Sequence, residues 1–177
     1  LLMLTALPTW ALDARLSKGE VLVETLTSSI NKHQQGVQVK MLINRPLAQV
    51  YATIRNTEAS LANDTAFKKV KVIKRIGSHQ EQVAYHMRNL PFSYVNLVTF
   101  YPNKGTSFSR ISGSFKSIEG GSQLQAIDEQ RTLLTYQLRV VPDVPIPQWM
   151  TNTILKIDLP RSLRTMRQAV YDAYPSS

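Results

Sequence analysis

Three histidines, His33, His79 and His86, are the first side chains to consider for chemistry, because imidazole can bind metals or move protons. None of them has a partner at the spacing that metal sites use, and the chain has no cysteine. We therefore predict no metal site, and we expect His33 and His79 in surface loops. The lack of cysteine also excludes disulfides and thiol catalysis, although it does not decide the compartment.

His86 is the histidine with the best case for catalysis. It lies on a predicted strand next to Tyr85, so one of these two side chains faces the interior and the other faces solvent. If His86 faces inward beside Tyr94 or Arg88, it can act as a general acid or base. Tyr136 and Arg110 would then orient the substrate, because a phenol or a guanidinium can hold its polar end. The catalytic candidates are His86, Tyr136 and Arg110.

Other signatures of enzymes are absent from the sequence. There is no Gly-x-Ser-x-Gly elbow, phosphate-binding loop or dinucleotide fingerprint, and Gly120-Gly121 between two predicted strands is typical of a hairpin turn. The carboxylates are scattered. Asp158 flanks the last helix without an evident partner, and we expect Asp64 and Glu58 to be solvated. No cofactor is predicted.

Aromatic and apolar side chains are the stronger candidates for a binding site. Those expected to line a pocket and contact a ligand are Tyr85, Tyr94, Phe100, Phe108, Phe115, Tyr136, Trp149, Leu155, Leu159 and Met166. The alternative is that they only fill the hydrophobic core, as most such residues do. A strongly curved sheet around one helix encloses more volume than side chains fill, and sites of this kind are mostly apolar with a few polar anchors.

The elements that must position these residues follow from hydrophobic periodicity. Leu134, Tyr136, Leu138 and Val140 alternate with polar residues, which indicates a strand with one buried face. Residues 148–174 then follow helical spacing, with Pro160 expected to kink the helix. The expected strands cover residues 20–26, 37–43, 67–76, 81–88, 92–101, 107–111, 114–118, 122–127 and 131–140, and two further helices cover 45–55 and 58–63. This order predicts an α+β domain in which an antiparallel sheet curves around the C-terminal helix.

The chain is basic, with 21 Lys and Arg against 12 Asp and Glu, a net charge of +9. No arginine-rich run or recognition-helix motif accompanies this charge, so nucleic acid is not an expected partner. Five cations crowd one predicted strand and three recur along the last helix: Lys68, Lys69, Lys71, Lys74, Arg75, Arg161, Arg164 and Arg167. They form either ordinary solvated faces or a basic rim that docks on anionic membrane lipids.

The first residues resemble the end of a signal peptide. Residues 1–11 are mostly apolar, and Thr9-Trp10-Ala11 fits the small-x-small pattern for cleavage before Leu12. We expect residues 1–11 to be the remnant of this signal and residues 12–177 to form a single domain. The protein would then be exported to the periplasm or cell envelope of a bacterium, and it would be cytoplasmic if the segment is not a signal.

Four stretches resemble the START-like, or SRPBCC, superfamily, of the polyketide cyclase/dehydrase and coenzyme-Q-binding type. They are Val37–Val50, with Asn44-Arg45-Pro46 after the strand; Gly113-Ser114-Phe115-Lys116 with Glu119-Gly120; Arg131–Tyr136; and Pro142 with Ile146-Pro147, followed by Leu159-Pro160-Arg161-Ser162-Leu163-Arg164. They occur in the family's order within the length of one domain.

The resemblance implies a helix-grip fold with an apolar cavity between the sheet and the C-terminal helix. Family members use this cavity for lipids, sterols, quinones or polyketides. We therefore expect a monomeric protein that binds or transports a lipid-like or other hydrophobic small molecule. Two alternatives stay open: a polyketide cyclase/dehydratase-like enzyme that uses the same cavity, and a module that docks on a membrane or a protein through its basic surface.

Overall fold

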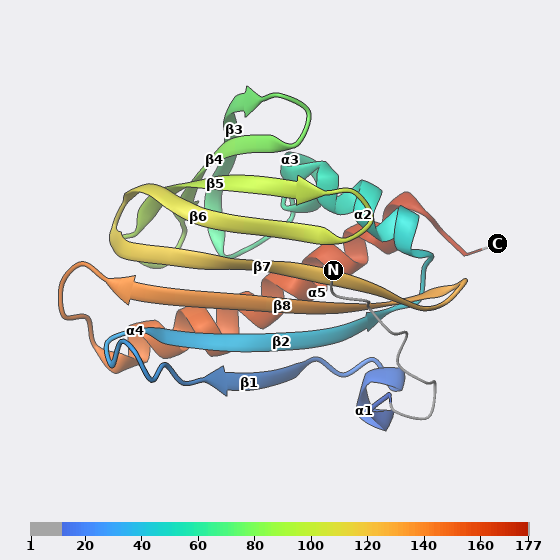
Figure 1. Cartoon of the computed structure of the whole chain (residues 1–177), viewed down its shortest axis with the longest axis horizontal. Coiled ribbons are helices and arrows are strands. Elements are labelled where there is room, and N and C mark those ends of the chain that lie inside the picture. Colours follow the sequence, from blue (N-terminus) through green and yellow to red (C-terminus); the bar gives the residue numbers. More distant parts are fainter. Residues whose placement is uncertain (1–11, 177) are drawn as a thin grey trace.

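The computed structural model describes residues 12–176, so the expected signal remnant at 1–11 lies outside the described residues. Eight strands form one sheet in the order β1-β2-β8-β7-β6-β5-β4-β3, and every neighbouring pair is antiparallel (Figure 1). The strands are β1 (Leu22–Leu26), β2 (Gln35–Ile43), β3 (Phe67–Ile76), β4 (Gln80–Met87), β5 (Ser93–Tyr101), β6 (Gly105–Gly113), β7 (Phe115–Asp128) and β8 (Arg131–Pro142).

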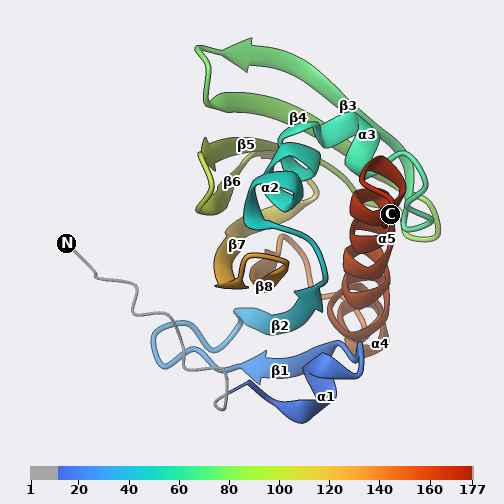
Figure 2. The same ribbon diagram turned by 90° about the vertical axis from the view of Figure 1, so that its right-hand side faces the viewer.

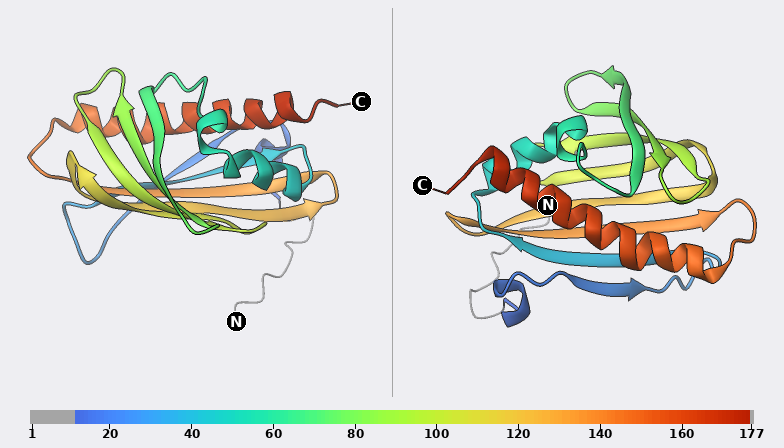
Figure 3. Two further views of the ribbon diagram at one scale, coloured as in Figure 1. Left: turned by 90° about the horizontal axis from the view of Figure 1, so that it is seen from above. Right: turned by 180° about the vertical axis from the view of Figure 1, so that it is seen from behind.

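The helices that follow β2 and β8 cover the concave side of this sheet. A short α1 (Ala14–Ser17), which the sequence pattern did not predict, precedes β1 and packs through Leu16 against Leu42 and Leu133 on the opposite face. The helices α2 (Leu47–Arg55) and α3 (Thr57–Ser60) follow β2. The C-terminal helix comprises α4 (Gln148–Asn152), a π-helical segment (Thr153–Asp158) and α5 (Leu159–Ala173). The sheet curls around this helix and α2 when it is viewed end-on (Figure 2), and the helix runs across it (Figure 3). The predicted helix-grip fold is confirmed.

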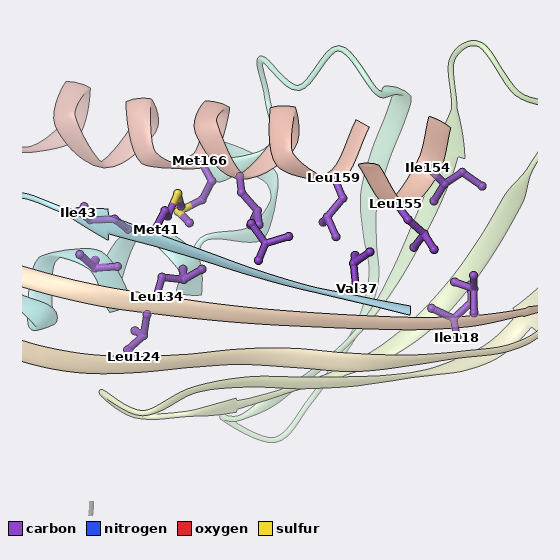
Figure 4. Close-up of a cluster of buried hydrophobic side chains, with 14 of the residues drawn as sticks. Val37, Met41, Ile43, Ile118, Leu124, Leu134, Ile154, Leu155, Leu159 and Met166 are labelled. Carbon is purple, nitrogen blue, oxygen red and sulfur yellow. The ribbon is translucent and has the colours of Figure 1, made fainter. Parts of the chain in front are cut away.

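Apolar side chains at every second position of β2 place one face of this strand at the centre of the core. Val37, Val39, Met41 and Ile43 have no exposed surface. They lie between the sheet and the C-terminal helix together with Leu134 of the paired strand β8 (Figure 4). Burying one face of a strand fixes its register, because a slip by one residue would expose all four side chains.

The C-terminal helix buries one apolar stripe in the same core. Leu155, Leu159, Leu163, Met166 and Val170 are all at most 9% exposed. Pro160 has no N–H to donate to the preceding turn, and the π-helical segment ends two residues before it. The kink expected at Pro160 stays a prediction.

The prediction of a hairpin at Gly120-Gly121 is wrong. Both glycines lie inside β7, a single strand that runs from Phe115 to Asp128 where two strands were expected. A Cβ at Gly120 would lie 2.0 Å from the Gln137 carbonyl oxygen, and one at Gly121 would lie 2.1 Å from that of Thr106. Glycine is needed here because neighbouring strands approach closely in the curved sheet, not because the chain turns.

Candidate ligand-binding cavity

A partly open cavity of about 190 Å³ lies between the concave face of the sheet and the helices. Its floor comes from the strands β3 to β8, and its other walls come from α2, α3, the π-helical segment and α5. An apolar cavity of roughly 150 Å³ can hold one benzene molecule, so this cavity has room for a compound of one or two rings. It is smaller than the roughly 300–1,000 Å³ of typical ligand pockets.

Seven of the ten side chains predicted as ligand contacts line the cavity: Tyr85, Tyr94, Phe100, Phe108, Tyr136, Leu159 and Met166. Phe115 and Leu155 do not; both are buried in the core, and Phe115 packs against Phe92 with ring centroids 5.0 Å apart. Trp149 is also not a lining residue; it lies in the first turn of α4 and is 58% exposed. The geometry therefore gives no support to these three as ligand contacts.

Aromatic rings form much of the cavity wall. The ring of Tyr85 stacks on that of Tyr94, with the ring centroids 5.0 Å apart and an angle of 22° between the ring planes. The ring centroid of Phe67 lies 5.4 Å from that of Tyr85. The ring of Phe108 on β6 also contacts that of Tyr136 on β8, with the ring centroids 5.8 Å apart. Phe67 was not among the predicted contacts, although an aromatic at the start of a predicted strand was a signal for it. Such paired rings are stiff and present flat apolar surfaces to a ligand.

Burial sets the protonation of the three tyrosines. The low-dielectric surroundings raise the pKa of Tyr85, Tyr94 and Tyr136 well above the ordinary value of 10, because the charged phenolate would lose its solvation. The three phenols are therefore neutral at physiological pH. They can donate or accept hydrogen bonds, but they are poor general bases.

Asn96 is a polar residue on the apolar floor that the sequence analysis missed. It is 4% exposed, and its Oδ1 atom has no hydrogen-bond partner among the described residues. The signal was present, since Asn96 lies on the same face of β5 as Tyr94, Val98 and Phe100. An unpaired buried acceptor costs free energy, so it marks a position where a ligand can supply the missing donor.

Asp158 is the carboxylate on the cavity wall. It belongs to the π-helical segment and is 7% exposed, with Arg161 Nη1 3.5 Å from its Oδ1. Burial raises the pKa of Asp158, and the opposing effect of the Arg161 charge is smaller. Ser60 and Ser162 also lie on this wall.

Asp64 is buried, so the expectation that it is solvated is wrong. It is 4% exposed in the turn between α3 and β3, where its Oδ1 accepts a 2.9 Å hydrogen bond from the Ala66 N–H. Its Oδ2 is buried without a partner in the described part of the chain. Asp64 lies close enough to raise the pKa of Tyr94, Tyr136 and Asp158, although it does not line the cavity.

The catalytic candidates are not brought together. His86 is exposed and its Nδ1 lies 3.0 Å from Ser93 Oγ, whereas its neighbour Tyr85 faces the cavity. Arg110 lies opposite Asn96 in the β5–β6 ladder but does not line the cavity; its Nη2 donates to the Gly113 carbonyl, and its Nε is buried without a partner in the described residues. Of the three candidates, Tyr136 alone reaches the cavity.

A buried ion pair holds α2 and α3 against the sheet. Arg55 Nη1 lies 2.8 Å from Glu81 Oε1, and Thr57 Oγ1 donates a 2.9 Å hydrogen bond to Glu81 Oε2. The Arg55 guanidinium also lies 4.4 Å from the centroid of the Phe100 ring. Because Thr57 and Phe100 both line the cavity, these contacts fix the distance between its helical wall and its floor.

The basic residues separate into two kinds. Lys68, Lys69, Lys71, Lys74 and Arg75 are exposed on β3, which is an edge of the sheet, and Arg161 and Arg164 are exposed on α5. Arg167 differs, because it is half-buried and donates to the carbonyls of Leu42 and Gly19. We therefore assign Arg167 to the packing of the helix rather than to a basic rim.

Neither a metal site nor a membrane span stands out in residues 12–176. No group of three His, Asp or Glu side chains comes together there as a potential set of metal ligands. Within the same range, no helix combines the length and hydropathy that crossing a bilayer requires.

Comparison with known proteins rests on the structure, since no family model and no curated protein matches the chain. Human StAR-related lipid transfer protein 5 superposes with a TM-score of 0.71 at 12% identity, covering 88% of this chain and 84% of that one. A STAR-related lipid transfer protein from Xanthomonas axonopodis gives 0.69 at 14% identity, covering 85% and 93%. The Zhui aromatase/cyclase from a Streptomyces species gives 0.66 at 13% identity, covering 80% and 93%.

These similarities cover 80–88% of this chain. At such low identity they bear on the fold and not on the activity. The chain has the START-like fold that its sequence motifs implied.

Proposed function

We propose that this protein binds a hydrophobic small molecule in the cavity and acts as a carrier or sensor, without catalysis. The observation that carries the proposal is the buried space between sheet and helix, lined by aromatic and aliphatic side chains from elements far apart in the sequence. Closely packed interiors contain few voids larger than a water molecule, so a space of this size is costly unless a ligand fills it.

Two further observations favour binding over catalysis. His86 lies outside the cavity, and the phenols inside it stay protonated, so the described residues on the wall include no group suited to act as a base at neutral pH apart from Asp158. Among proteins of similar fold, two are described as lipid transfer proteins and one as an aromatase/cyclase. The two lipid transfer descriptions support an apolar ligand here.

Native mass spectrometry of the purified protein tests this proposal, combined with organic extraction and analysis of the extract. We expect a bound apolar compound, or stoichiometric uptake of a small fluorescent hydrophobic probe by the empty protein. Val98→Phe is a suitable control variant, because Val98 lies on the floor and a larger ring there would occupy the cavity. Protein that is reproducibly empty and takes up no probe would refute the proposal.

Peripheral contact with an anionic membrane is a second proposal, supported by the exposed cations of β3. Phe67, the first residue of that strand, lines the cavity, so a bilayer docked on β3 would lie close to the ligand. Co-sedimentation with vesicles tests this. We expect binding that rises with the fraction of anionic lipid and falls when Lys68, Lys69 and Lys71 are changed to Glu. Binding that ignores lipid charge would refute it.

Export stays a prediction from residues 1–11, and cell fractionation of the native host is its test. Recovery in the periplasm or envelope is the expected result, and recovery in the cytoplasm would contradict it. The monomeric state is likewise a prediction, which light scattering in solution can check.

A further inference from the structure

The charges on the cavity wall restrict the ligand more than its apolar character does. Among the described residues that line the cavity there is no Lys, Arg or His, and the single ionisable acid is Asp158. Arg110 pairs with Asn96 in the β5–β6 ladder, and Arg55 and Arg161 contact Phe100 and Asp158, but none of these three arginines is among the lining residues. A carboxylate entering this space would lose its hydration without gaining a cationic partner, which is costly.

Among the hydrogen-bonding groups of the wall, the unpaired oxygen of Asn96 favours a ligand that carries a donor. Asn96 Oδ1 is a buried acceptor whose hydrogen bond is not made within the described residues. It lies on the same face of β5 as the Tyr94 phenol, which can donate or accept. A hydroxyl group can donate to Asn96 and accept from a tyrosine at once, whereas a carboxylate can only accept.

The shape of the wall adds a preference for rings. Six aromatic side chains face the cavity, and the volume of about 190 Å³ suits one or two fused rings. A long acyl chain would need the helix to move away from the sheet.

We propose that the ligand is a neutral, ring-containing alcohol or phenol whose hydroxyl donates to Asn96 Oδ1, and that the cavity discriminates against the corresponding carboxylate. This inference rests on the proposed binding function and names its ligand class. It makes Asn96 a specificity-determining residue.

Three probes with one ring system test the proposal: naphthalene, 2-naphthol and 2-naphthoate, titrated into the whole chain at neutral pH. Supplying a donor to a buried, unpaired acceptor should make 2-naphthol bind about tenfold more tightly than naphthalene, or about 1.4 kcal/mol. The 2-naphthoate anion should bind at least about tenfold more weakly than 2-naphthol, because its desolvation is uncompensated.

Asn96→Leu keeps a side chain of similar size and removes the acceptor. We expect it to bind 2-naphthol and naphthalene equally, so the retained affinity for naphthalene shows that the variant is folded. Tyr101→Phe removes a hydroxyl from an exposed tyrosine outside the cavity and should leave all three affinities unchanged.

Equal affinity for the alcohol and the carboxylate would overturn the inference while leaving the binding function intact. A preference for 2-naphthol that survives in Asn96→Leu would overturn the role of Asn96. If none of the three probes binds, both the inference and the proposed binding of small hydrophobic ring compounds fail.

Discussion

Replacing Arg55 by Met probes the ion pair that fixes the cavity's helical wall. The change keeps the aliphatic stem of the side chain but leaves the Glu81 carboxylate without its closest cation. Glu81 is 1% exposed, so water cannot solvate its unpaired negative charge. Removing one partner of a buried ion pair typically costs about 3–5 kcal/mol of stability.

The structure places Arg55→Met at the lower end of this range, at about 3 kcal/mol. Arg75 Nε remains 3.5 Å from Glu81 Oε1, and Thr57 still donates to Glu81 Oε2, so part of the charge stays compensated. For a domain of this size, about 3 kcal/mol corresponds to a fall in Tm of roughly 6–12 °C. Urea unfolding followed by far-UV circular dichroism measures the change in free energy of unfolding.

A second substitution separates the charge from the packing. In Arg55→Met with Glu81→Gln, the amide oxygen can still accept from Thr57, but no uncompensated charge remains. We therefore expect the double variant to recover about 1–2 kcal/mol relative to Arg55→Met. The pair of Arg131 and Asp128 is the control, because the Asp128 side chain is 42% exposed, whereas that of Glu81 is 2% exposed. Arg131→Met should therefore change stability little.

Two results would refute this reasoning. One is an Arg55→Met variant whose stability falls by no more than that of Arg131→Met, which would mean that the buried pair does not hold the wall. The other is a double variant less stable than Arg55→Met, which would assign the loss to packing and not to the buried charge.

Three further predictions follow from the sheet, the helix and the cavity. Gly120→Ala should lower the free energy of unfolding by at least about 2 kcal/mol in urea titrations, because its Cβ would meet a backbone carbonyl that cannot move aside; unchanged stability would contradict the close strand contact. Asp158→Asn should be more stable than the wild type at neutral pH, since burial raises the pKa of Asp158 above its ordinary value of 3.8 and penalises the ionised form. This difference in stability should shrink as the pH falls through the raised pKa of Asp158, because the wild-type carboxylate then takes up a proton. Asp172→Asn, on the exposed side of α5, is the control. A stability difference that grows at acid pH would contradict the prediction. Val98→Phe should abolish binding of naphthalene in calorimetric titrations while Tm is maintained, because the added ring fills empty space; retained binding would place the ligand elsewhere.

Much of the fold could be predicted because its signals are local. The pattern of buried and exposed side chains predicted three features: the buried face of β2, the bounds of β3 and the apolar stripe of the C-terminal helix. The structure agrees with all three. The glycine pair in β7 could not be interpreted in this way. Glycine is selected both by tight turns and by close strand contacts, and the second cause depends on residues such as Gln137 that are distant in sequence.

The sequence predicted which types of residue form the candidate site better than it predicted which individual side chains face the cavity. Strand alternation limits Tyr85 and His86 to opposite faces, but it does not say which of them faces the cavity. Burial of Asp64 and exposure of Trp149 depend on how the helices close over the sheet, so no local pattern revealed them. Asn96 was the exception, since a polar residue on an otherwise apolar strand face was visible in the sequence.

The central claim is that a small apolar ligand lies between the sheet and the C-terminal helix. Intermolecular NOEs in the complex with naphthalene test it most directly. We predict NOEs from the ring protons to the methyl groups of Leu159, Leu163 and Met166, which line the cavity from the helix. Binding accompanied by NOEs to exposed groups such as Val144 and Trp149, with none to those three residues, would contradict the claim.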